Sequence, residues 1–170
     1  MSDLYEQRCS MVQEQNECYL EIFRQSLEGK LSGKVIRRHL SNMDLFLNWF
    51  LTDYVEHDWG KDEKAGEDSY GPAPMEAGMG EVGEFLGYFM IRKCMDSTPA
   101  SIRSAAASIK KFYKCMLENK QYGKVSPWTE EGFREEYDDM LEHIKDRMEE
   151  WQADCAQYND PSQPNPFEVF

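Results

Sequence analysis

The residues best suited to chemistry in this sequence are basic side chains gathered in one short segment. Six Lys or Arg and one Glu lie between Ser97 and Lys124, a local net charge of +5 in a chain whose formal net charge is −13. Arg103, Lys110 and Lys114 are separated by seven and four residues, so a helix would place them along one stripe of its surface. Rows of ammonium and guanidinium groups bind phosphates, and the pattern therefore predicts a surface for a polyanion.

A second group of basic residues occupies the start of an expected helix that follows Ser32. The helix dipole favours acids at this end, so three bases here indicate a purpose other than helix stability. The candidate DNA-binding residues are therefore Lys34, Arg37, Arg38, Arg103, Lys110, Lys111 and Lys114. The alternative interpretation is an ordinary solvated face, in which the lysine stems cover apolar surface.

The acidic residues lie in other segments. Eleven acids and three bases fall between Glu130 and Asp154, and seven acids and two bases between Asp53 and Asp68. An acidic helix at 130–154 either folds over the basic stripe of its own chain and masks it, or meets a basic protein partner. The second functional hypothesis is therefore an acidic protein–protein interaction module rather than a DNA-binding one.

Catalytic motifs are missing from the sequence. No Ser-His-Asp, Cys-His, phosphate-loop or metalloprotease pattern occurs. Gly78-x-Gly80-x-x-Gly83 has the spacing of a dinucleotide-binding loop, but it follows a Pro-rich segment and no strand, so we interpret these glycines as bends in a loop. Five cysteines and three histidines are dispersed without metal-ligand spacing. We expect no enzymatic activity, no cofactor and no metal.

Length and composition predict one helical domain with appendages. The 170 residues are 41% hydrophobic and include nine Phe, nine Tyr and four Trp, enough for a packed core. No apolar run approaches the roughly 18 residues that span a bilayer. The acidic, polar start lacks the features of a signal peptide, and scattered cysteines suit a reducing compartment. We expect a cytoplasmic protein with no membrane partner.

Helical periodicity and capping residues divide the chain into an all-α fold. A first helix ends near Leu27, a second runs from Ser32 to about Val55, and a third passes through 82–90. A fourth begins at Thr98-Pro99 and a fifth covers about 130–157. Ile109, Phe112 and Met116 form the apolar face of the fourth helix.

These elements suggest three parts. Residues 1–125 form the helical core, with a long acidic Gly- and Pro-containing loop near 56–80; residues 126–158 form an acidic helix packed on that core. Residues 159–170 form a Pro-rich extended tail, and we expect its Phe167, Val169 and Phe170 to dock on the body of the protein rather than on a partner.

Two stretches carry a resemblance to a known family. "LSGKVIRRHLSNMDLFLNWFL" and "TPASIRSAAASIKKFYKCMLENKQYG" resemble the second and fourth helices of the SAM-like core-binding domain of phage integrases and other tyrosine recombinases. The likeness covers about Cys18 to Gly123, about two thirds of the chain, and lies in helix lengths, caps and apolar positions. It implies a SAM-like four-helix core that presents helices two and four to the major groove of duplex DNA.

The chain departs from that family in two respects. The recombinases continue into a catalytic domain with a His-x-x-Arg pair and a nucleophilic Tyr, whereas 47 residues follow Gly123 here and no His precedes an Arg by three positions. Family members also clamp DNA with a basic surface, and this chain is acidic overall. The resemblance therefore implies a non-catalytic binding module.

Overall fold

The computed structural model describes residues 3–60 and 70–162, and most of these residues are helical. In chain order the elements are α1 (Asp3–Leu27), α2 (Gly33–Asp44), η1 (Leu45–Tyr54), β1 (Glu56–Asp58), β2 (Tyr70–Pro72), η2 (Met75–Glu81), α3 (Val82–Glu84), η3 (Phe85–Phe89), α4 (Met90–Lys93), α5 (Pro99–Glu118) and α6 (Glu130–Tyr158). Among the described residues the sheet is limited to the two short antiparallel strands β1 and β2. The predicted all-α class is therefore confirmed as a mostly helical fold.

Helix starts follow the capping residues of the sequence. The Ser32 hydroxyl accepts a hydrogen bond from the Val35 N–H at 3.4 Å, and Thr129 caps α6 in the same way. Thr98 and Ser101 form a reciprocal capping box at the start of α5, with proline at the first helical position. The predicted starts at Ser32 and Thr98 are confirmed, and of the two candidate starts for the last helix, Ser126-Pro127 and Thr129, the structure has Thr129.

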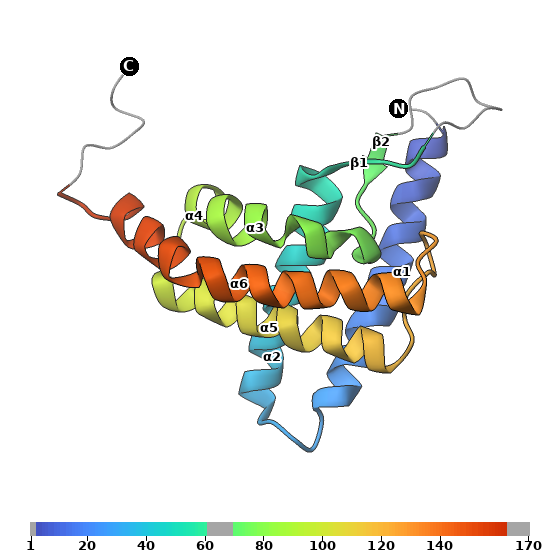
Figure 1. Cartoon of the computed structure of the whole chain (residues 1–170), viewed down its shortest axis with the longest axis horizontal. Helices are drawn as coiled ribbons and strands as arrows, with labels where there is room; N and C mark the ends of the chain where they lie inside the picture. Colours follow the sequence, from blue (N-terminus) through green and yellow to red (C-terminus); the bar gives the residue numbers. More distant parts are fainter. Residues whose placement is uncertain (1–2, 61–69, 163–170) are drawn as a thin grey trace.

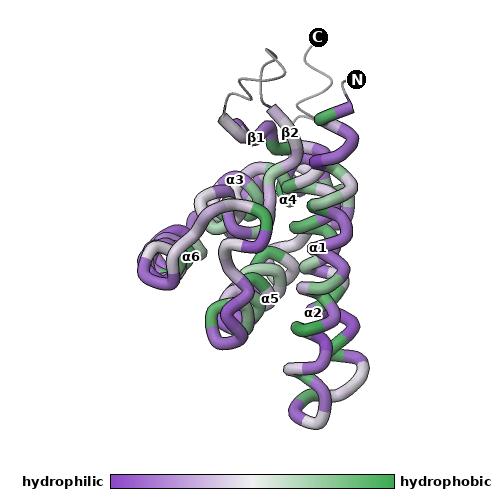
Figure 2. The backbone as a smooth tube through the Cα atoms, turned by 90° about the vertical axis from the view of Figure 1, so that its right-hand side faces the viewer, coloured by the Kyte–Doolittle hydropathy of each residue, from purple (hydrophilic) through white to green (hydrophobic). Residues whose placement is uncertain are grey.

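The helices form two groups that pack across each other. Figure 1 shows α5 and α6 running side by side in opposite directions, joined by the segment after Glu118. In Figure 2, α1 and α2 stand together on one side of the molecule, while α5 and α6 lie on the other. α5 contacts α1, α2 and α6, so it lies at the centre of the fold and its two faces have different neighbours.

The inward face of α5 supplies the centre of the core. Ile109, Phe112 and Met116 are each 0% exposed, which confirms their predicted orientation. The Phe112 ring meets the Phe23 ring of α1 edge-on, with centroids 5.4 Å apart. Burial of this face leaves the opposite face of the same helix in solvent.

The second predicted helix has the expected extent but changes its winding halfway. Residues 33–54 are continuous helix, and from Leu45 the helix widens into the π form. The Thr52 hydroxyl donates to the Leu47 carbonyl oxygen, five residues earlier, at 2.8 Å. A second π-helix, η3, lies inside the predicted third helix, which consists of short α, π and α turns.

Stacked aromatic rings accompany both π-helices. Phe46, Phe50 and Tyr54 form a column with centroid separations of 5.8 and 5.5 Å, and Phe85 stacks on Phe89 at 5.8 Å. The two columns interlock, since the Phe50 centroid lies 5.1 Å from those of Phe85 and Phe89. Wider turns place residues four apart nearly above one another, which suits this stacking.

The prediction of a loop at 56–80 is wrong in part. β1 pairs with β2 in the register Glu56 to Pro72, and η2 forms a 3-10 helix. The Arg8 guanidinium of α1 lies 5.3 Å from the centre of the Trp59 ring, whose N–H donates to the Pro72 carbonyl oxygen at 3.0 Å. Three-residue strands are too short to show alternation in sequence. Residues 61–69 lie outside the described part of the chain.

The interpretation of the glycines at 78–83 as loop bends is also wrong, because two of them allow close packing. A Cβ at Gly78 would lie 2.3 Å from the Tyr113 hydroxyl oxygen, and one at Gly83 would lie 2.6 Å from His143 Nε2. Gly87 is similar, with Trp151 Nε1 at 2.6 Å from the added atom. These glycines create gaps that ring side chains of α5 and α6 fill.

The end of α6 is fixed to the start of α5. The Asn159 side-chain amide donates to the Ser97 carbonyl oxygen at 3.1 Å, and that of Gln152 donates to the Pro99 carbonyl oxygen at 3.0 Å. The described part of the predicted tail ends at Ser162. The predicted docking of Phe167, Val169 and Phe170 falls outside the described residues.

Candidate nucleic-acid interface

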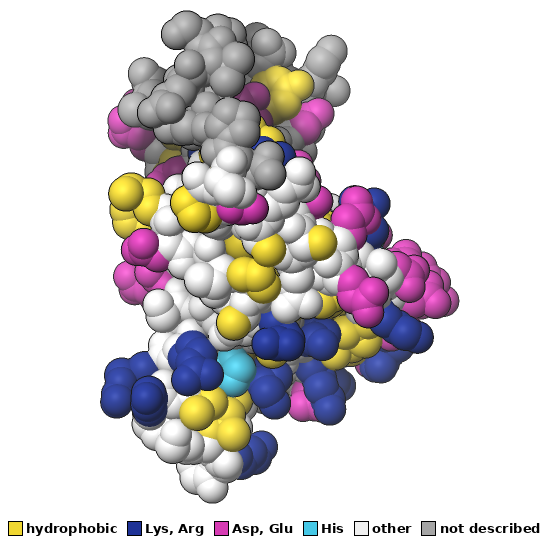
Figure 3. All heavy atoms as spheres, turned by 90° about the vertical axis from the view of Figure 1, so that its left-hand side faces the viewer, with side chains coloured by type: hydrophobic (Ala, Val, Ile, Leu, Met, Phe, Trp, Pro, Cys, Tyr) yellow, Lys and Arg dark blue, Asp and Glu magenta, His cyan; other side chains and the backbone are white. Residues whose placement is uncertain are grey.

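The seven predicted DNA-binding residues lie on two helices in mutual contact. We call this set the basic surface, and all of its side chains are exposed. It consists of Lys34, Arg37 and Arg38 on α2 and Arg103, Lys110, Lys111 and Lys114 on α5. In Figure 3 the dark-blue side chains form a band across the lower half of one face, and acidic side chains lie above it and at its edge.

A row of polar side chains, which we call the polar seam, joins the two helices. His39 Nδ1 and the Ser108 hydroxyl oxygen lie 2.8 Å apart, and the Asn42 amide donates to the hydroxyls of Ser108 and Ser104 at 2.9 and 3.1 Å. Ser104 and Asn42 remain half-exposed. The seam is a hydrogen-bonding strip within the basic surface.

Sequence reasoning did not identify the seam. His39 and Asn42 are one turn apart on α2, and Ser104 and Ser108 one turn apart on α5, so each pair shares a helix face. The sequence signal that could have revealed the seam is the occurrence of polar residues one turn apart, next to the apolar residues of each helix. The two pairs meet only through the crossing of α2 and α5.

His39 of the polar seam lies within electrostatic range of cations from both helices. His39 is 7% exposed, and burial is the main reason that its pKa lies below the ordinary value. Lys111 of α5 and Arg38 of α2 lower this pKa further, because their positive charges disfavour a protonated imidazole. One cation from each helix therefore lies within electrostatic range of the same ring.

We expect the free energy of unfolding to fall when the pH drops below about 6.5, the ordinary pKa of histidine. The folded state lowers the pKa of His39, so the unfolded chain binds the proton more readily and gains from acidification. The contribution is complete above the unfolded pKa and is lost as the pH falls toward the folded one. Urea unfolding of the protein and of the His39→Gln variant at several pH values isolates the contribution of His39 to the free energy of unfolding, because the variant lacks this part of the pH dependence. Equal pH profiles for the two proteins would contradict the assignment.

The acidic helix α6 does not neutralise the basic surface through direct ion pairs in residues 3–60 and 70–162. Within that part, Lys114 is the one member with an acidic partner inside 4.0 Å, and the partner is Glu118 of its own helix at 3.9 Å. α6 approaches the same end of α5 across a shallow cleft of about 320 Å³. Its charged lining is Lys114, Glu118, Lys120, Glu130, Arg134 and Asp138.

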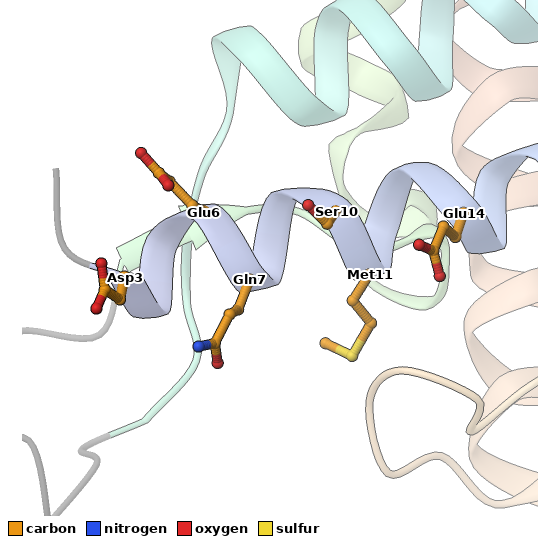
Figure 4. A pocket seen from close by; sticks show the side chains of 6 residues that line it. All are labelled: Asp3, Glu6, Gln7, Ser10, Met11 and Glu14. Atoms are coloured by element: carbon orange, nitrogen blue, oxygen red, sulfur yellow. The ribbon is translucent and has the colours of Figure 1, made fainter.

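Other surfaces offer less convergent chemistry. A second concave area is lined only by exposed residues of α1, including Asp3, Glu6 and Glu14, whose side chains project from a single helix (Figure 4).

The described residues contain no group of three or more His, Cys, Asp or Glu that could hold a metal ion. None of the described helices has the length and apolar character needed to cross a bilayer. All five cysteines are free thiols.

The arrangement is suited to contact with an extended polyanion: exposed cations lie on two helices, with hydrogen-bonding side chains between them. Comparison of the chain with protein-family models, with curated proteins and with solved structures finds no match.

Proposed function

We propose that this protein is a non-catalytic helical module that contacts duplex DNA through the basic surface of α2 and α5. The observation that carries the proposal is convergence: seven exposed bases lie on two helices that are far apart in sequence but in contact, within a chain of net charge −13. Exposed bases gathered on one face create a local positive potential that attracts an anionic ligand.

The net negative charge is compatible with this function. Exposed charges more than about 8 Å from a phosphate are largely screened at physiological ionic strength. The acids Glu130 and Asp138 of α6 line the cleft beside Lys114, at one end of the basic surface, and no ion pair joins α6 to that surface within the described residues. Local charge therefore dominates the contact, and the distant acids reduce affinity without abolishing it.

The resemblance to the core-binding domain of tyrosine recombinases supports duplex DNA as the ligand. In that family the counterparts of α2 and α5 face the major groove, and a SAM-like core of the first four helices would present them in the same way. Under this hypothesis Ser104 and Asn42 lie where side chains contact base edges, while the cations contact phosphates.

We expect the double variant Arg38→Ala, Lys111→Ala to bind duplex DNA more weakly and with a shallower dependence on salt. Each lost phosphate contact lowers the slope of log affinity against log salt by about one, so two should be lost. Unfolding free energies should change by less than about 0.5 kcal/mol, because both side chains are exposed. Titration of a labelled duplex at several salt concentrations measures the slope.

A matched control is available outside the basic surface. Lys93→Ala with Lys145→Ala removes the same charge from exposed positions on α4 and α6 and should leave the slope unchanged. If both double variants behave alike, or if the first keeps the full slope, the basic surface is only a solvated face. The acidic interaction module would then be the better hypothesis.

A further inference from the structure

Three large aromatic side chains stand in solvent on the two π-helices. We call them the aromatic surface: Trp49 and Tyr54 of η1, which are 59% and 38% exposed, and Tyr88 of η3, which is 38% exposed. Trp49 lies one π-helical turn before Tyr54, since hydrogen bonds in this helix join residues five apart. π-Helical turns are rare and frequently lie at functional sites, and these turns carry exposed rings.

The contacts of Tyr54 join the two π-helices into one surface. Its ring centroid lies 5.2 Å from that of Phe89, the residue after Tyr88, and its hydroxyl lies 3.3 Å from a carboxylate oxygen of Glu84. Burial, the Glu84 carboxylate and Tyr88 raise the pKa of Tyr54, which shows that these groups are within electrostatic range of its hydroxyl. Together they form a ring-lined area supported by the interlocked aromatic columns beneath it.

Acidic side chains lie on and next to the two π-helices. Asp53 lies in the turn after Trp49, Glu84 contacts Tyr54, and Glu56 lies two residues after the end of η1; all three are exposed. Within residues 3–60 and 70–162 none of them forms an ion pair within 4.0 Å. Glu81 is half-buried nearby, and burial, followed by the charge of Glu84, raises the pKa of its carboxyl group.

We propose that the aromatic surface docks a basic segment of a partner protein in which Arg or Lys side chains alternate with apolar ones. The rings offer apolar contact and cation–π faces, while the unpaired carboxylates attract the cations. A cation–π contact of this kind already occurs within the chain: the Arg92 guanidinium lies 5.0 Å from the centre of the Tyr88 ring and 5.4 Å from that of Tyr158. The acids disfavour DNA here, so this site is independent of the proposed DNA contact.

The probe for this site is a fluorescently labelled peptide of alternating Arg and Leu. Anisotropy titration should show saturable binding, and a Glu–Leu peptide of equal length should not bind. Trp49→Ala should weaken binding at least tenfold, whereas Tyr70→Ala, which removes another exposed ring at 55% exposure, should leave it unchanged. Full affinity in Trp49→Ala would overturn the proposal. Circular dichroism of each variant confirms that it is folded.

Net charge alone attracts basic peptides to an acidic protein, so a charge-matched pair is needed. Asp53→Asn with Glu84→Gln should weaken binding at least threefold and flatten its salt dependence. Glu131→Gln with Asp139→Asn changes the net charge equally from exposed positions on α6 and should have no such effect. Equal losses in the two pairs would overturn the proposal. Self-association of the unlabelled protein, lost in Trp49→Ala, would identify a second copy as the occupant and overturn it as well.

Discussion

Truncation of Phe112 to alanine is expected to lower the free energy of unfolding by about 3–5 kcal/mol. The side chain is 0% exposed and packs edge-on against the rings of Phe23 and Tyr113, with centroids 5.4 and 5.3 Å away. Its removal leaves a cavity between α1 and α5 in addition to the lost burial of apolar surface. Urea unfolding followed by circular dichroism measures the change.

The matched control for this variant is Lys110→Ala on the same helix. Lys110 is exposed, so its truncation to alanine in the same helix should change the free energy of unfolding by less than about 0.5 kcal/mol. A loss below about 1 kcal/mol in Phe112→Ala would mean that the core collapses into the gap, and that α5 is not the rigid centre of the fold.

Replacement of Glu76 by alanine is expected to cost about 2–3 kcal/mol of stability. Glu76 is 1% exposed, and its Oε1 accepts hydrogen bonds from the N–H groups of Lys124 and Val125 at 3.0 and 3.2 Å and from the Tyr19 hydroxyl at 3.4 Å. One carboxylate thus connects α1, η2 and the segment before α6. Each buried donor left without a partner costs about 1–3 kcal/mol, and the partly exposed N–H groups recover some of this from water.

Two further variants test the role of this carboxylate. Glu76→Gln retains an acceptor oxygen and should lose less stability than Glu76→Ala. In a double-mutant cycle with Tyr19→Phe, the two losses should not add, because both remove the same hydrogen bond. Unchanged stability in Glu76→Ala would show that the cost of burying the carboxylate cancels its hydrogen bonds; Glu76 Oε2 has no hydrogen-bond partner among the described residues.

Features that depend on neighbouring residues were predictable from the sequence. Ser32, Thr98 and Thr129 begin helices because each hydroxyl meets an N–H group three residues later. Gly29 and Gly123 have φ of 75° and 71°, the left-handed conformation that favours glycine near helix ends. The exposure of the basic residues and the burial of Phe112 followed from helical periodicity alone.

Features that depend on distant residues were not predictable. His39 meets Ser108 across 69 positions, and Glu76 meets Lys124 across 48, so neither pairing has a local signature. Glu76 looked like one more acid in a polar loop. The π-helix at η1 was hidden because its segment is apolar on nearly every side, which leaves the periodicity undefined.

The glycine gaps that receive His143 and Trp151 also restrict how the protein moves. Sliding α6 along its neighbours would move these rings out of the gaps at Gly83 and Gly87, so we expect shear motion to be unfavourable. We therefore expect α6 to separate from the core as one cooperative unit. Amide hydrogens along its buried face should therefore exchange together, on the timescale of that single opening, rather than in a gradient from one end.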